Sequence, residues 1–166
     1  MLEQHREDEG GIANRFMTIL VPVDFSPCSR LAFQKAAELV QDGRGRIVAL
    51  HVVDHDFVNE CVRHRLGNPG EIKKTLFLEA KKKLENFLRH EEKDGFQVEF
   101  MVAEGTPFIE INKKAVQTKA EMIVMGSCGN AADMNTIFFG STAEKVLRFL
   151  SRPVLCVPPS LDYKGV

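Results

Sequence analysis

Short, continuous apolar runs alternate with longer amphipathic segments along most of the chain. Runs of this length that are rich in β-branched residues are typical of strands buried on both faces of a parallel sheet. Such runs cover residues 17–23, 46–54, 96–102, 121–126 and 154–157. Between them, apolar residues recur at helical spacing, as Leu31, Ala32, Ala36, Leu39 and Val40 do after the first run. The pattern therefore predicts strands and helices in alternation.

Punctuating residues place the helix ends. Ser26 and Pro27 open a helix after the first strand, and Thr106 with Pro107 open another after the third, because Ser or Thr before Pro suits a helix start. A long amphipathic helix over residues 71–94 is ended by Gly95. Residues 55–70, which include "GNPG", are interpreted as a polar and less regular link.

This alternation predicts the α/β class, with a doubly wound, five-stranded parallel sheet and helices on both faces. Right-handed crossovers make 3-2-1-4-5 the simplest strand order, so the first and fourth strands become neighbours. Ligands of such sheets bind beyond the carboxyl ends of the strands where the winding reverses. Those ends are residues 22–24 and 125–129.

Three glycines, Gly126, Gly129 and Gly140, lie at this expected site and precede an amphipathic helix. Glycine lets the backbone approach a ligand closely, and a helix N-terminus favours a negative charge. Ser141 and Glu144 have the spacing of a capping box, which supports a helix start there. The pattern favours a phosphate site, although a strand-end turn and a helix cap account for the same residues.

Composition limits the other possibilities. The 166 residues fit one domain, and 44% of them are hydrophobic. A net charge of −1 gives no pull toward nucleic acid or a membrane surface, and no apolar run is long enough to span a bilayer. The polar start carries no secretory signal pattern, so we expect a cytoplasmic protein. We expect a polar N-terminal tail over residues 1–15, a domain over 16–160 and a C-terminal tail over 161–166.

The cysteines and histidines suggest no catalytic or metal site. The four cysteines are scattered and form no Cys-x-x-Cys, so we expect free thiols. Cys28 and Cys128 lie near the expected site but have no identifiable base for nucleophilic catalysis. The polar residues of the link and its flank do not have zinc-like spacing and are interpreted as solvated, without a metal. They are His51, Asp54, His55, Asp56, Cys61 and His64.

Two common nucleotide motifs are excluded. A dinucleotide-binding site requires Gly-x-Gly-x-x-Gly directly after the first strand, where this chain has "DFSPCS". A Walker loop requires Gly-x-x-x-x-Gly-Lys followed by Ser or Thr, which the chain lacks.

Six segments in sequence order resemble the universal stress protein family: "ILVPVDFS", "IVALHVVD", "EGTPFIEI", "IVMGSCG", "GSTAEKVLR" and "RPVLCVP". The resemblance runs from Met17 to Pro158. It implies the 3-2-1-4-5 order, in a Rossmann-like sandwich of the adenine nucleotide alpha hydrolase type. In the nucleotide-binding branch of the family it also implies an ATP or AMP site.

The resemblance assigns residues to the adenosine end of this site. Asp24 would hold the ribose or the adenine. Pro22, Val23 and Val52 would line the base pocket. Its floor would be formed by Met125 and Gly126.

The phosphate end is assigned in the same way. Cys128 and Gly129 would offer backbone groups to the phosphates. Gly140, Ser141 and Thr142 would close on them at the helix start.

The chain departs from the family pattern at one point. Ten residues, "NAADMNTIFF", separate Gly129 from Gly140, where the family has nine. This stretch has no Lys or Arg, so the phosphates would lack the nearby cations that strengthen a triphosphate site. We expect AMP or ATP as the ligand, with Mg²⁺ optional. Phe138 or Phe139 could instead fill the pocket and exclude the ligand.

We therefore expect an adenine-nucleotide-binding regulatory protein of the stress response that is not an enzyme. The alternative is a family dimer that has lost nucleotide binding and acts through protein contacts, and slow ATP hydrolysis is a third reading. Prolines bracket the last strand, which suits a sheet edge. The resemblance implies homodimer pairing through that strand, and the alternative is an edge covered by residues 159–166. The strand residues are Val154, Leu155, Cys156 and Val157.

Overall fold

The computed structural model describes residues 17–40, 43, 45–91, 96–129 and 139–159. The predicted tails, residues 1–15 and 161–166, lie outside the described residues. The strands are β1 (Met17–Pro22), β2 (Gly45–Asp54), β3 (Gln97–Gly105), β4 (Met122–Gly126) and β5 (Val154–Val157). The helices are α1 (Pro27–Val40), α2 (His55–Arg63), α3 (Pro69–Glu91), α4 (Pro107–Gln117) and α5 (Ser141–Arg148).

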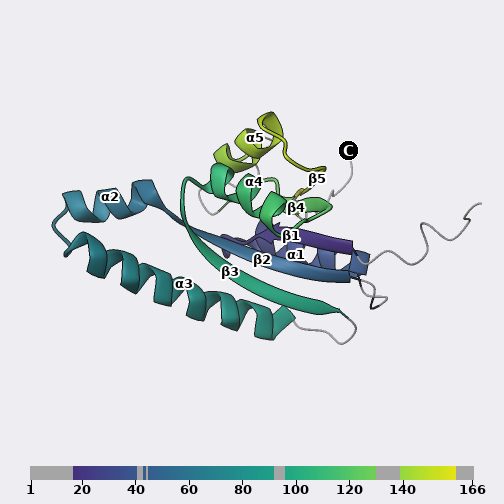
Figure 1. The fold of residues 1–166 in the computed structure, drawn as a ribbon, viewed down its shortest axis with the longest axis horizontal. Helices are drawn as coiled ribbons and strands as arrows, with labels where there is room; N and C mark the ends of the chain where they lie inside the picture. The colour runs from purple at the N-terminus through teal and green to yellow at the C-terminus, as the bar shows by residue number, and fades with distance from the viewer. Residues whose placement is uncertain (1–16, 41–42, 44, 92–95, 130–138, 160–166) are drawn as a thin grey trace, which may run out of the picture.

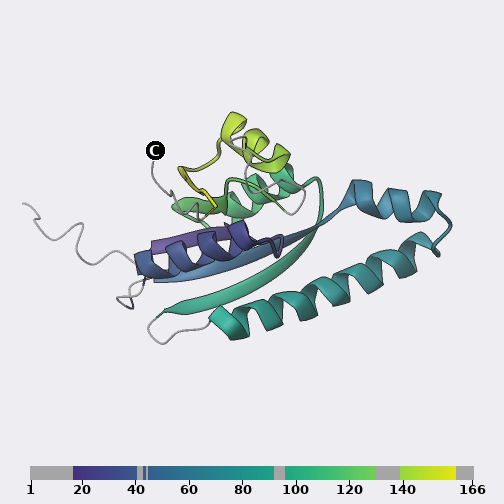
Figure 2. The same cartoon turned by 180° about the vertical axis from the view of Figure 1, so that it is seen from behind.

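The five strands form one parallel sheet in the order β3-β2-β1-β4-β5. Helices α4 and α5 cover one face of this sheet, and α1 and α3 pack against the other (Figures 1 and 2). β1 pairs with β4, through Ile19 opposite Met122 and Leu20 opposite Ile123. The predicted fold class, strand order and switch point are therefore confirmed.

The buried residues of β1 explain why its sequence is apolar without alternation. Successive strand residues point to opposite faces. Ile19 and Val21 join the core under α1 and α3, whereas Leu20 joins the core under α4 and α5. All three side chains are fully buried. A strand covered on both faces needs apolar residues at every position.

The polar link predicted for residues 55–70 is wrong, because its first part is helix α2. Asp54 caps this helix, and its carboxylate accepts a hydrogen bond from the Asp56 backbone N–H at 2.9 Å. Of the α2 side chains only Val58 is buried, and it packs with Val53 and Ala80 in a small separate cluster. Helix α2 and the first turns of α3 extend beyond the end of the sheet (Figure 1).

Strand β5 lies at one edge of the sheet, as predicted. Successive residues of β5 direct their backbone N–H and C=O groups alternately toward β4 and away from it. The Ile123 N–H donates to the Pro153 carbonyl at 2.8 Å, and the Ser127 N–H donates to the Val157 carbonyl at 2.9 Å. The intervening Val154 and Cys156 therefore turn their backbone groups away from β4. No helix in the described part of the chain is long and apolar enough to cross a membrane.

Candidate functional site

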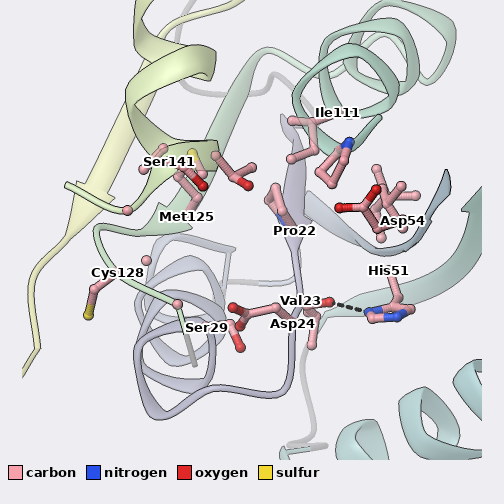
Figure 3. Close-up of a pocket in the computed structure, with 18 of the residues that line it drawn as sticks. Pro22, Val23, Asp24, Ser29, His51, Asp54, Ile111, Met125, Cys128 and Ser141 are labelled. Carbon is pink, nitrogen blue, oxygen red and sulfur yellow. Dashed lines mark hydrogen bonds between the residues drawn. The ribbon is translucent and has the colours of Figure 1, made fainter. Parts of the chain in front are cut away.

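A cavity of about 870 Å³ opens beyond the carboxyl ends of β1 and β4 (Figure 3). This volume is within the range usual for small-molecule sites, and apolar groups form most of the lining. Every residue that the sequence assigned to the site lines the cavity: Pro22, Val23, Asp24, Val52, Met125, Gly126, Cys128, Gly129, Gly140, Ser141 and Thr142.

A tight turn after β1 positions the carboxylate of Asp24. Its Oδ1 accepts hydrogen bonds from the Ser26 backbone N–H at 3.0 Å and from the Ser26 hydroxyl. The Ser26 hydroxyl oxygen in turn accepts from the Ser29 backbone N–H at 3.1 Å, so Ser26 is the cap of α1. Phe25 completes the turn with a left-handed backbone, φ 65°. Asp24 is therefore held in place by the same bonds that start α1.

His51 lies on β2 beside this turn. Its Nδ1 is 2.7 Å from the Val23 carbonyl oxygen, so Nδ1 carries a proton and donates (Figure 3). The ring stacks on Phe25, with centroids 4.6 Å apart. Burial lowers the pKa of His51 and Lys83 adds to this, outweighing the Val23 hydrogen bond and the Asp24 charge that raise it. The ring is therefore neutral at neutral pH.

The exit from β4 lies directly against the first turn of α1. A Cβ atom at Gly126 would come within 2.7 Å of the Cys28 Cβ and 2.8 Å of the Cys28 carbonyl carbon. A Cβ at Gly129 would come within 2.8 Å of Asp24 Oδ2. Gly126 therefore lets the backbone at the end of β4 approach α1 more closely than any other residue allows, and Gly129 leaves room for the Asp24 carboxylate.

Helix α5 begins at the cavity, but the predicted capping box is wrong. The N-cap is Gly140, which has no side chain to cap the helix, and Ser141 is already the first helical residue. Glu144, placed in the box, instead pairs with Arg148 at 2.7 Å. The first N–H groups of a helix have no acceptor within it, and Ser141, Thr142 and Ala143 all line the cavity. An uncapped helix start of this kind can bind an anion.

The expectation of four free thiols is also wrong. Cys28 in the first turn of α1 and Cys128 after β4 form a disulfide, with Cα atoms 6.1 Å apart. The sequence did not show this pairing because the two residues are separated by 100 positions. Cys61 and Cys156 are free, and burial raises the pKa of Cys156.

Several lining residues escaped the sequence analysis. Asp54 and Phe57 come from the start of α2, which was not predicted, and Pro107 and Ile111 come from α4. Two signals for α2 were available: the capping pattern of Asp54 and the helical spacing of Phe57, Val58, Cys61 and Val62. On α4, residues that face the cavity and residues that face the core follow the same apolar period. The remaining lining residues that were missed are Ser29, Leu50, His51 and Ala143.

The charge of the lining is acidic. Asp24 and Asp54 contribute carboxylates, and the described residues of the lining include no lysine or arginine. Within the described ranges no three His, Cys, Asp or Glu residues gather closely enough to hold a metal ion. An anion bound here would therefore be held by backbone N–H groups.

The structure describes one of the two phenylalanines that could have filled the pocket. Phe139 is 51% exposed and does not line the cavity. Phe138 and most of the ten-residue segment between Gly129 and Gly140 lie outside the described residues.

The chain matches known proteins along most of its length. The model of the universal stress protein family matches residues 15–158. Universal stress protein MJ0577 of Methanocaldococcus jannaschii is 30% identical over 154 residues, which cover 86% of this chain and 94% of that protein. YxiE of Bacillus subtilis is 29% identical over 147 residues, covering 86% and 99%.

Solved structures agree with this match. One of MJ0577 has a TM-score of 0.72 at 31% identity and covers 86% of this chain and 95% of that one. A universal stress protein of Archaeoglobus fulgidus, solved in complex with dAMP, has a TM-score of 0.57 at 25% identity and covers 85% and 97%. Sequence and fold together show that the chain belongs to the universal stress protein family.

Proposed function

We propose that the chain binds an adenine nucleotide, ATP or AMP, in the cavity at the β1 and β4 switch point and acts as a regulatory protein of the stress response. The observation that carries this proposal is the arrangement of one apolar cavity with an uncapped helix start at one end and a fixed carboxylate beside it. These groups match the three parts of the ligand: an apolar base, a sugar with hydroxyl donors, and an anionic tail.

The adenosine end of the ligand lies among residues from β1, β2 and β4. Pro22, Val52 and Met125 offer apolar contacts to a purine. Asp24 is an acceptor whose position is fixed by Ser26, which suits a ribose hydroxyl. The dAMP complex of the Archaeoglobus fulgidus relative supports an adenine nucleotide as the ligand.

The phosphates lie at the start of α5. The N–H groups of Ser141, Thr142 and Ala143 are the donors, and the dipole of the helix adds a favourable field. The carboxylates of the lining repel a polyphosphate, so Mg²⁺ would strengthen ATP binding by offsetting this charge. AMP carries less charge and should depend less on Mg²⁺.

The protein would act as a homodimer and not as an enzyme. Nothing in the described lining forms a nucleophile with an adjacent base, the arrangement that covalent catalysis requires. At the sheet edge, Val154 and Cys156 turn backbone groups outward, which supports pairing of β5 with a second copy. The alternative of a family dimer without nucleotide rests on the acidic lining.

Calorimetric titration of the full chain with ATP and AMP, each with and without Mg²⁺, tests the binding proposal. We expect saturable binding that is at least tenfold weaker in Asp24→Ala, because the ribose loses an acceptor. Asp56→Ala is the matched control, since Asp56 is an exposed aspartate of α2 that does not line the cavity, and it should bind as the unmodified chain does. If neither ATP nor AMP gives a heat of binding, the alternative of a family dimer without nucleotide is favoured.

Light scattering tests the dimer separately. Cys156→Pro removes an N–H that faces away from β4, so it should shift the mass from dimer to monomer while circular dichroism stays unchanged. A dimer that survives this substitution would place the interface elsewhere.

A further inference from the structure

We propose that Cys28 and Cys128 form a reversible thiol–disulfide pair that tunes nucleotide affinity by fixing the backbone after β4. This inference rests on the proposed function, because it assigns a regulation to the same cavity. It joins three features of the structure: the pairing across the switch point, the place of Cys128 beside the glycines, and the greater exposure of Cys128.

The pair joins the two segments that leave the switch point. Cys28 is the second residue of α1, on one face of the sheet, and Cys128 follows β4. Their Cα separation of 6.1 Å is within the range of ordinary disulfides, so the backbone already holds the two residues at bonding distance. Gly126 makes this possible, since any side chain there would collide with Cys28.

The bond acts where the proposed phosphate site is assembled. Ser127 is tied by its N–H to Val157 and by its carbonyl to the Gly140 N–H at 2.8 Å. Gly129, on the other side of Cys128, lies against Asp24. The disulfide adds a covalent tie to α1 between these two contacts. In the reduced protein that tie is absent, and residues 128–129 are held by non-covalent contacts alone.

Cys128 is the more exposed member of the pair. Cys28 is 1% exposed and Cys128 is 7% exposed; Cys128 lies at the cavity edge with its sulfur pointing away from the other labelled lining residues (Figure 3). Cys128 is therefore the thiol that meets a small oxidant first, and Cys28 is the resolving thiol beneath it.

Hydrogen peroxide is the oxidant class that this geometry suits, because it is small and uncharged. The Cys128 thiolate attacks one peroxide oxygen, the O–O bond breaks, and a sulfenic acid and hydroxide form. The Cys28 thiolate then displaces the sulfenic oxygen, which leaves as water after protonation, and the S–S bond forms. In sum, two thiols and one peroxide give one disulfide and two waters. A dithiol reductant reverses the reaction by exchange and is itself oxidised.

The direction of the effect follows from pre-organisation. Ordering a loop on binding reduces affinity, and a cross-link that orders it beforehand removes part of this loss. The oxidised protein should therefore bind ATP more tightly than the reduced protein, by about three- to tenfold. Binding and oxidation would then favour one another, as linkage requires.

The experiment uses the full chain in two states, one treated with peroxide and one with a dithiol, each freed of reagent. Alkylation followed by mass spectrometry of proteolytic peptides counts and locates the free thiols. Four alkylated cysteines are expected in the reduced protein, and only Cys61 and Cys156 in the oxidised one. ATP titration of both states then gives the affinity ratio.

Two variants control the measurement. Cys28→Ser cannot form the bond but leaves the lining intact, so its ATP affinity should be that of the reduced protein under both treatments. Cys61→Ser removes an unpaired thiol outside the cavity and should keep the full redox response.

Each result has one meaning. Tighter ATP binding after oxidation, lost in Cys28→Ser, supports the proposal. Equal or weaker binding in the oxidised state overturns the regulation and leaves the proposed function standing. The regulation is also overturned if Cys28 and Cys128 can still be alkylated after peroxide treatment. If neither state binds ATP, AMP is titrated in its place, and lack of binding of both nucleotides in both states overturns the proposed function and the regulation together.

Discussion

The two segments that leave the switch point reach the same cavity by opposite means. The turn from β1 to α1 is short, and side chains hold it: Asp24 and Ser26 bond to each other, and Ser26 caps the helix. The passage from β4 to α5 is long, and its contacts at the cavity are made by glycine backbone. The first segment thus presents a fixed carboxylate, and the second presents N–H groups. A ligand with hydroxyls at one end and an anion at the other needs both.

The closest approach of the two segments is the point most sensitive to change. Gly126→Val would place a branched side chain within 2.7 Å of the Cys28 Cβ, against buried backbone that has little room to move. We expect a loss of about 2–3 kcal/mol in the free energy of unfolding, because overpacking a dense core costs this much. Urea denaturation measures it.

Gly70→Ala is the matched glycine control for this substitution. Its Cβ would meet only the Asn68 side chain, at 3.5 Å, in the exposed first turn of α3. It should leave stability unchanged or raise it by up to about 1 kcal/mol. A Gly126→Val protein as stable as the unmodified chain would show that the two segments can separate freely.

Ser26→Ala tests the segment that side chains hold. The substitution removes one donor to Asp24 and the cap of α1, so unfolding should become easier by about 1–2 kcal/mol. ATP affinity should also fall, because Asp24 loses its fixed position. Ser26→Thr keeps the hydroxyl and should recover most of both losses, whereas a failure to recover would point to packing and not to the hydrogen bonds.

Gly129→Ala tests the contact between the two segments at the ligand. The added methyl group would approach Asp24 Oδ2 to 2.8 Å, and the carboxylate can move away at small cost. We expect a stability change below about 1 kcal/mol but a severalfold loss of ATP affinity, since Asp24 would be displaced. Parallel urea and ATP titrations separate the two effects, and unchanged affinity would contradict the role given to Asp24.

The smallest expected effect is a pH dependence from His51. Burial lowers the pKa of His51 in the folded state. Below about pH 6.5 the imidazole is therefore protonated in the unfolded chain but still neutral in the folded one. Stability is therefore complete above this pH and falls as the pH drops toward the folded-state pKa. His51→Gln should flatten the fall in urea midpoint between pH 7.5 and 5.5, and His64→Gln, at an exposed site, should not. Equal slopes in all three proteins would remove His51 as the cause.

The sheet could be predicted because its pattern is local and repeated. Each strand is a short apolar run, and the order follows from connection rules that do not depend on side-chain detail. Helix α2 was missed although Phe57, Val58, Cys61 and Val62 recur at helical spacing, because it is only nine residues long and its polar residues were interpreted as part of a link. It remains helical through the Asp54 cap and its contact with α3.

The site, like the fold, could be predicted where it depends on strand order and not where it depends on helix packing. Residues at the carboxyl ends of β1 and β4 could be named because the strand order fixes their neighbourhood. Phe57 and Ile111 could not, since their place at the cavity depends on how α2 and α4 are rotated and packed. The Cys28–Cys128 pair and the N-cap at Gly140 depend on distances of a few ångströms, which hydrophobic periodicity does not encode.

Helix α2 and the first turns of α3 extend past the sheet and are held by the small cluster of Val53, Val58 and Ala80. Phe57, on this extension, is 52% exposed, and Leu66 is 70% exposed. With so little buried apolar surface, the extension should behave as a separate cooperative unit that opens at a lower free energy than the sheet. Its amides should exchange with deuterium earlier than those of β1 and β4. Because Phe57 forms part of the cavity wall, we expect the opening of this unit to set how quickly the proposed ligand dissociates.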